Sequence, residues 1–232
     1  MSRVSTGIPG MDELVEGGYP RGNLIVLSGP PGSGKTIFGF QFLYDGILKR
    51  GEVGLYVSFL ETKESFFSNF EHLGFDLDDL KKTDRFALMS FVTTLEQGMT
   101  DSIGQVINEI SRRKATILVI DSFTAIKASI TKPIEARIFL NTILGKMTRL
   151  LGCTTLLIVE KMGNERGGPG MEEFVADGVV NLEAIVDGLE IRRRLLIPKM
   201  RGTSHSLRYQ NMVIGRNGLL ITGVTKGHRG QY

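Results

Sequence analysis

The stretch GPPGSGKT, from Gly29 to Thr36, decides the fold class of this 232-residue chain. It follows an apolar run, Leu24 to Ser28, that is typical of a buried strand, and it precedes a helix-length segment, Thr36 to Arg50. A glycine-rich loop between a strand and a helix, with the spacing G-x4-G-K-T, wraps phosphates with its backbone N–H groups. The sequence therefore predicts a P-loop nucleotide-binding domain.

Each residue type in this loop has a role in phosphate chemistry. Lys35 is predicted to neutralise the β and γ phosphates of ATP, and the Thr36 hydroxyl is predicted to ligate Mg²⁺. The helix that begins here would present its N-terminal N–H groups to the anion. The predicted nucleotide-binding residues of this segment, for ATP or ADP, are Gly29, Pro30, Pro31, Gly32, Ser33, Gly34, Lys35, Thr36 and Ile37.

Carboxylates at predicted strand ends supply further chemistry. The run ILVIDS, from Ile117 to Ser122, places Asp121 at the tip of a buried strand, where it can hold the shell of a magnesium ion. Glu61 follows the predicted strand Gly54 to Phe59, which we expect to lie near the P-loop strand. Glu61 is therefore the candidate general base, and a favourable place at the start of the next helix is the alternative. Glu160, which ends another strand, either senses the γ-phosphate or caps its strand.

Apolar runs bounded by turn residues alternate with helix-length segments, which predicts βαβ units around a mostly parallel sheet. The predicted strands are Leu24 to Ser28, Gly54 to Phe59, Arg85 to Ser90, Thr116 to Asp121 and Thr154 to Glu160. The predicted helices are Thr36 to Arg50, Thr62 to Leu73, Gly98 to Arg113 and Pro133 to Leu151. Their spacing along helices indicates that four aromatic residues pack in the core: Tyr44, Phe66, Phe67 and Phe70.

The two ends of the chain read differently from this middle part. Residues 1–23 form a lead-in with a helix of one or two turns, in which Pro9 lies near the first turn and Gly17-Gly18 ends the helix. From Gly178 onward, short runs rich in β-branched residues predict an antiparallel β extension, residues 178–232. No linker divides the chain, so we expect one domain, residues 1–232, with an α/β P-loop core.

Composition limits the location and the partners. With 41% hydrophobic residues, no apolar run near the length of a membrane helix, no apolar signal core and the single Cys153, the chain is expected to be cytoplasmic. Nine of the 28 basic residues and none of the 25 acidic ones lie from Ile191 to Tyr232. The first 190 residues thus hold 19 basic and 25 acidic residues, a net charge of −6. The basic end is either a solvated tail or a surface that faces phosphates.

With these residues located, the chain resembles the RecA-superfamily ATPases, and among them single-domain relatives of the clock protein KaiC. The resemblance spans nearly the whole chain and includes GPPGSGKT and ILVIDS. Further motifs that carry it are TGIPGMDEL (6–14), FLET (59–62), GMEEFVADGVV (170–180) and KMRGTSH (199–205). The last two motifs are the more specific ones.

The resemblance implies an ATPase that assembles as a ring, commonly a hexamer, with nucleotides held between neighbouring subunits. The KMRGTSH motif would then reach the nucleotide of the next subunit through Lys199, Met200, Arg201, Thr203 and His205. Lys35 is the one cation within the P-loop itself, and the transition state of phosphoryl transfer spreads further charge over the γ-phosphoryl oxygens. Lys199 and Arg201 are therefore predicted to assist Lys35 and Glu61 in catalysis.

The chain departs from the KaiC pattern at two places. Where KaiC-type domains carry two adjacent glutamates, this chain has Leu60 and Glu61, so slow hydrolysis is expected. Glu173 and Phe174 stand where the kinase-like KaiC domain has its phosphoacceptors, so autophosphorylation there is not expected. We expect a ring-forming ATPase that serves signalling or the regulation of a partner.

Two other functions compete with this reading. The first is a recombinase-like ATPase that binds single-stranded DNA through Arg166 in the loop Gly163 to Gly170 and through the basic C-terminal segment. The second is a small-molecule phosphotransferase, although no second substrate pocket is identified.

Overall fold

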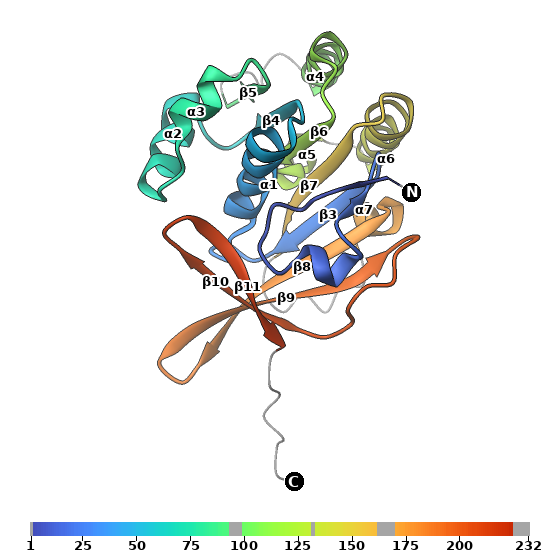
Figure 1. Ribbon diagram of the computed structural model, residues 1–232. Coiled ribbons are helices and arrows are strands. Elements are labelled where there is room, and N and C mark those ends of the chain that lie inside the picture. The colour runs from blue at the N-terminus through green and yellow to red at the C-terminus, as the bar shows by residue number, and fades with distance from the viewer. Residues whose placement is uncertain (1, 93–98, 131–132, 162–169, 225–232) are drawn as a thin grey trace.

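The computed structural model describes residues 2–92, 99–130, 133–161 and 170–224. Its centre is a nine-stranded sheet in the order β11-β10-β9-β8-β3-β7-β6-β4-β5 (Figure 1). The six strands from β8 to β5 are parallel, and β9, β10 and β11 extend the sheet antiparallel. The strands are β3 (Leu24–Gly29), β4 (Gly54–Ser58), β5 (Phe86–Ser90), β6 (Ile117–Asp121), β7 (Thr154–Glu160), β8 (Gly178–Asp187), β9 (Glu190–Met200), β10 (Gln210–Gly215) and β11 (Gly218–Val224). The predicted α/β class, with its antiparallel end, is confirmed.

Helices cover both faces of the sheet. On one face lie α1 (Lys35–Arg50), α2 (Lys63–His72) and α3 (Leu77–Lys82), packed against alternate residues of the strands. On the other face lie α4 (Met99–Arg113), α5 (Phe123–Ser129), α6 (Pro133–Thr142), the π-helix η3 (Ile143–Leu150) and the short α7 (Met171–Val175). Because side chains alternate along each strand, the two faces carry two separate hydrophobic clusters.

The aromatic residues of α1 and α2 form the centre of the first cluster. Phe66 and Phe70, each 1% exposed, lie one helical turn apart, and Phe70 stacks on Phe40 with ring centroids 3.8 Å apart. Tyr44 and Phe67 are partly buried against the same cluster. The prediction that these aromatic residues pack in the core is confirmed.

The N-terminal lead-in and the strand order define the chain path more closely than the sequence does. The N-terminal helix is one short 3-10 turn, η1 (Asp12–Val15), with Pro9 shortly before it and Gly17-Gly18 shortly after it. A small antiparallel sheet of β1 (Arg3–Val4) and β2 (Tyr19–Pro20) surrounds this turn. The strand β4 does not lie beside the P-loop strand β3, since β7 and β6 separate the two. Within the described ranges, no helix is both long and apolar enough to cross a membrane.

Candidate nucleotide-binding site

The P-loop connects the C-terminal end of β3 to the start of α1. Gly32 and Gly34 have φ angles of 75° and 100°, values that side chains rarely tolerate, and they turn the loop around its own backbone. Gly34 is the N-cap residue of α1 and carries no side chain that could occupy the first N–H groups of the helix. These N–H groups are therefore available to an anion.

Lys35 and Ser33 are polar side chains buried in this loop without a charged partner in the described structure. Lys35 is 6% exposed, and its Nζ donates a hydrogen bond of 2.9 Å to the carbonyl of Pro30, a neutral acceptor. Burial lowers the pKa of Lys35, and the nearby carboxylates of Glu160 and Asp121 act in the opposite direction. The buried Ser33 Oγ has no hydrogen-bond partner among the described residues. A buried cation beside an unused hydroxyl fits a phosphate group.

Thr36 and Asp121 meet as the sequence predicts. The Thr36 hydroxyl donates to Asp121 Oδ2 over 2.8 Å, so the start of α1 contacts the C-terminal end of β6. Mg²⁺ commonly takes one or two protein oxygens and completes its shell with water and substrate phosphates. The pair therefore suits a magnesium ion that accompanies a nucleotide.

Tyr56 is a site residue that the sequence did not reveal. Its hydroxyl, buried within β4, donates to the same Asp121 Oδ2 over 2.8 Å. Burial raises the pKa of Asp121, while the hydrogen bonds from Tyr56 and Thr36 lower it. The only sequence signal was a tyrosine two residues before the end of an apolar strand, and this position could not be matched to Asp121 before the strand order was known.

Glu61 lies in the loop after β4, and its backbone is fixed at both polar groups. Its N–H donates to Ser58 Oγ over 3.0 Å, and its carbonyl accepts from Ser90 Oγ over 2.8 Å. The Asn69 amide donates to both oxygens of its carboxylate over 3.3 and 3.4 Å. Because Ser58 pairs with Asp121 across β4 and β6, Glu61 comes near the site through β6 instead of β3. Leu60, in place of a second glutamate, is 50% exposed.

Glu160 lies closer to the P-loop strand than Glu61 does. It ends β7, where it is the register partner of Gly29, and its N–H donates to Thr124 Oγ1 over 2.8 Å. The negative charge of Glu160 raises the pKa of Lys35 more than the negative charge of Asp121 does. This placement agrees with the reading that Glu160 senses the γ-phosphate, and it leaves Glu61 as the candidate base on the opposite side of Asp121.

Arg193, in the middle of three consecutive arginines on β9, also reaches the P-loop. Its Nε donates to the carbonyl of Gly32 over 3.0 Å. Arg192 instead pairs with Asp187, and Arg194 pairs with the carboxylate of Glu183 on β8. Strand alternation explains the difference, because the middle arginine faces away from its neighbours. All three arginines thus have partners within the subunit.

The KMRGTSH motif lies at the opposite end of the sheet from the P-loop. The N–H of Arg201 donates to the carbonyl of Asp177, and the N–H of Asp177 donates to the carbonyl of Leu24, both over 2.9 Å. Arg201 is thus level with the first residue of β3, whereas Gly29 is the last. Five residues of strand at about 3.3 Å each separate the two levels by about 16 Å. The structure therefore does not bring these predicted residues to the P-loop of the same subunit.

Lys199 and Arg201 of this motif both contact residues of their own subunit. Lys199 Nζ donates to the carbonyls of Glu173 and Phe174 over 2.9 and 3.2 Å. Arg201 lies just beyond β9 and contacts the Asp177 carboxylate over 3.4 Å. Burial, then the charge of Arg201, lowers the pKa of Lys199.

The other three predicted binding residues of the motif differ in what they can offer a ligand. Met200 is 4% exposed and packs in the core, so only its backbone is available. Thr203 Oγ1 accepts from Arg3 Nη1 over 3.1 Å. The buried Nε2 of His205 has no hydrogen-bond partner among the described residues. Ile37, the last residue predicted around the P-loop, is partly buried against the core.

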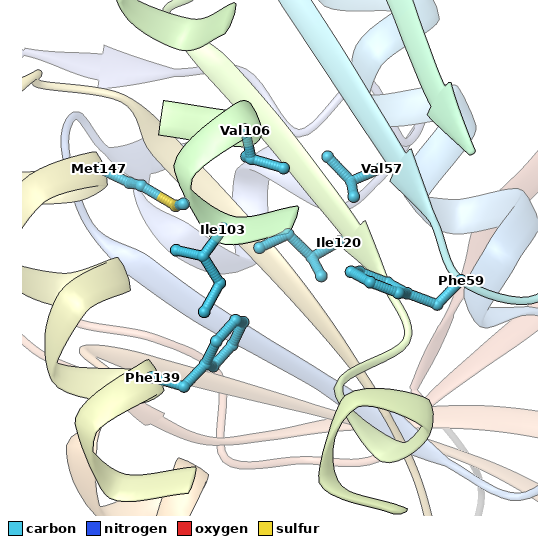
Figure 2. Close-up of a pocket in the computed structure, with 7 residues that line it drawn as sticks. All are labelled: Val57, Phe59, Ile103, Val106, Ile120, Phe139 and Met147. Carbon is cyan, nitrogen blue, oxygen red and sulfur yellow. The ribbon is translucent and has the colours of Figure 1, made fainter. Parts of the chain in front are cut away.

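Two remaining features add no nucleotide chemistry. Figure 2 shows a small pocket between α4, η3 and the strands, and its lining is entirely apolar: Val57, Phe59, Ile103, Val106, Ile120, Phe139 and Met147. It is a gap in the second hydrophobic cluster. Arg166 and residues 163–169 of the loop considered for DNA binding lie outside the described residues.

Comparison with known proteins places this geometry in context. The family model described as "ATPase: KaiC" matches residues 4–226. A UPF0273 protein of Thermotoga maritima is 38% identical, over 95% of this chain and 96% of the relative, and one of Pyrococcus horikoshii is 36% identical, over 94% and 93%. The solved structure of the KaiC-like protein PH0186 from Pyrococcus horikoshii matches with a TM-score of 0.84 and 33% identity, over 95% of this chain and 98% of that one.

Proposed function

The chain belongs to the KaiC family of ATPases. We propose that it assembles into a homohexameric ring, binds Mg-ATP between neighbouring subunits and hydrolyses it slowly. The cycle would serve signalling or the regulation of a protein partner. The observation that carries the proposal is the contact of Thr36 with Asp121 beside the buried Lys35. A hydroxyl, a carboxylate and an ammonium in this arrangement suit a nucleoside triphosphate and its magnesium ion.

The chain's own residues account for the steps of the proposed reaction. The P-loop N–H groups and Lys35 would hold the phosphates, and Asp121 and Thr36 would supply oxygen ligands to Mg²⁺, which would neutralise charge on the phosphoryl group. Glu61, fixed through Ser58 and Ser90, would orient the attacking water and accept its proton. A single carboxylate at this position supports slow turnover.

The sharing of nucleotide between subunits is supported by the separation of the two cationic groups. Lys199 and Arg201 are too far along the sheet to reach the P-loop of their own subunit, yet they stand two residues apart at the end of β9 and are both partly exposed. A second copy placed end to end with the first would bring them to its phosphates. Such a head-to-tail contact forms a ring when its rotation closes.

Lys35→Ala tests the nucleotide site directly. We expect the loss of a charge-assisted contact to weaken Mg-ATP binding by about 1.5 to 3 kcal/mol or more, measured by calorimetry. Lys49→Ala is the matched control, because Lys49 lies on the same helix and its side chain is 70% exposed. Equal ATP affinity in the wild type and in Lys35→Ala would refute the assignment of the P-loop.

A further inference from the structure

The short helix α7 lies between the P-loop and the distant pair of cations. At the P-loop side, the N–H of Lys161 donates to the carbonyl of Gly29 over 3.0 Å, which ties Lys161 to the first residue of the loop. Lys161 also directly follows Glu160, the carboxylate that acts on Lys35. Its ammonium forms an ion pair with the carboxylate of Glu173 in α7. This ion pair connects α7, through Glu173, to the P-loop.

The other side of α7 holds Lys199. Its ammonium donates to the carbonyls of Glu173 and Phe174, near the C-terminal end of the helix, where a cation is favoured. Glu173 therefore contacts two lysines through two different groups, Lys161 through its carboxylate and Lys199 through its carbonyl. The Glu173 side chain is only 10% exposed, so the ion pair is weakly screened by solvent.

Arg201 is held in another way. Its N–H and its guanidinium both contact Asp177, and the carboxylate of Asp177 accepts from the N–H of Leu24 over 3.1 Å. Arg201 is thus attached to the first residue of β3 and to the sheet itself. Lys199 depends on α7, so it is the member of the pair that a movement of α7 would displace.

We propose that Lys161 and Glu173 are positioning residues that set Lys199 through α7 according to the nucleotide held by their own P-loop. The inference rests on the proposed function and adds a coupling between neighbouring sites of the ring. A nucleotide that shifts Gly29 and Glu160 moves Lys161, the ion pair moves α7, and the carbonyls of α7 move Lys199 toward or away from the neighbour's phosphates. The linkage gives each site an influence on the next.

The two contacts of Glu173 can be separated by mutation. Glu173→Gln removes the charge that holds Lys161 and keeps the carbonyl that holds Lys199. Lys161→Met removes the same ion pair from a side chain that is 38% exposed, and it provides the test if Glu173→Gln does not fold. The double variant Lys161→Glu with Glu173→Lys restores a pair of opposite sign. Glu109→Gln is the matched control, since its partly buried carboxylate pairs with arginines of α4 on the same face of the sheet.

Two measurements test the proposal, one of them independent of activity. Hydrogen exchange of the α7 amides should slow by about fivefold or more in the wild type when a non-hydrolysable ATP analogue binds, and this response should disappear in both single variants. ATP titrations of hydrolysis should give a Hill coefficient above 1 in the wild type and in Glu109→Gln. The coefficient should fall to about 1 in the single variants and recover in the double variant, with calorimetric ATP affinity kept within about threefold.

The outcomes are distinct. Single variants that retain the exchange response and the wild-type Hill coefficient would overturn the role of the ion pair, and so would a wild-type ring that hydrolyses ATP without cooperativity. A wild-type protein that neither binds nor hydrolyses ATP would instead overturn the proposed function, and the coupling with it.

Discussion

Replacement of Arg201 with alanine should lower ATP turnover by about 10³-fold at most, the scale of an arginine finger, with a modest loss of nucleotide affinity. This factor corresponds to about 4 kcal/mol of transition-state stabilisation. The Arg201 side chain is 54% exposed and its carboxylate contact is 3.4 Å long, so its removal should leave the fold intact. A loss of activity would then report on the site and not on unfolding.

The structure also predicts whose nucleotide Arg201 serves. Arg201 is level with Leu24, about 16 Å along β3 from the last residue of the strand. An extended arginine side chain spans six bonds, about 7 Å from Cα to the terminal nitrogens. Because this reach is less than half of the separation, a direct contact of Arg201 with the phosphates requires a neighbouring subunit's nucleotide.

Mixed rings provide the assay. Subunits with Arg201→Ala are combined with subunits with Glu61→Gln, and native mass spectrometry verifies that mixed rings form. Some interfaces then pair an intact Glu61 with a neighbour's intact Arg201, so turnover should partly recover. Arg192→Ala, which removes another exposed arginine of β9 with a partner aspartate, is the matched control. Mixed rings that show only the sum of the two separate activities would refute action in trans.

Two further predictions concern the carboxylates near the P-loop. Glu61→Gln should keep ATP bound and slow hydrolysis by about 10²-fold or more, measured as single turnovers, and wild-type turnover would direct attention to Glu160. Tyr56→Phe removes a hydrogen bond that lowers the pKa of Asp121, which burial has already raised, so the carboxylate should take up its proton at a higher pH. Mg²⁺ binds the charged form of the carboxylate. As the pH is lowered, the magnesium affinity of Tyr56→Phe should therefore begin to fall at a higher pH than that of the wild type, as magnesium titrations over a pH series would show. The control Tyr19→Phe, at another buried tyrosine, should leave the pH dependence of magnesium affinity unchanged. The same pH dependence in both variants would contradict this account.

Local patterns in the sequence predicted the parts of the site that are contiguous in the chain. The P-loop and Asp121 each combine a buried strand with a polar residue at its end, and this combination defines a place at one edge of a parallel sheet. Tyr56 and Arg193 could not be found in this way. Their roles depend on which strands are neighbours and on which face each side chain points to, and both follow from long-range pairing. For the same reason, the expectation that β4 lies near β3 did not reveal that β7 and β6 separate the two strands.

One property of this sheet supports the proposed ring, namely that β9 runs antiparallel to β3. Such a strand carries its first residues toward the P-loop and its last residues away from it, so Arg193 contacts Gly32 while Lys199 contacts α7. One strand can therefore supply a cation to its own P-loop and further cations to a different one. If neighbours meet end to end, an open chain leaves one P-loop without these cations, whereas a closed ring completes every site. Closure is thus the arrangement in which all subunits of the proposed assembly are equivalent in catalysis.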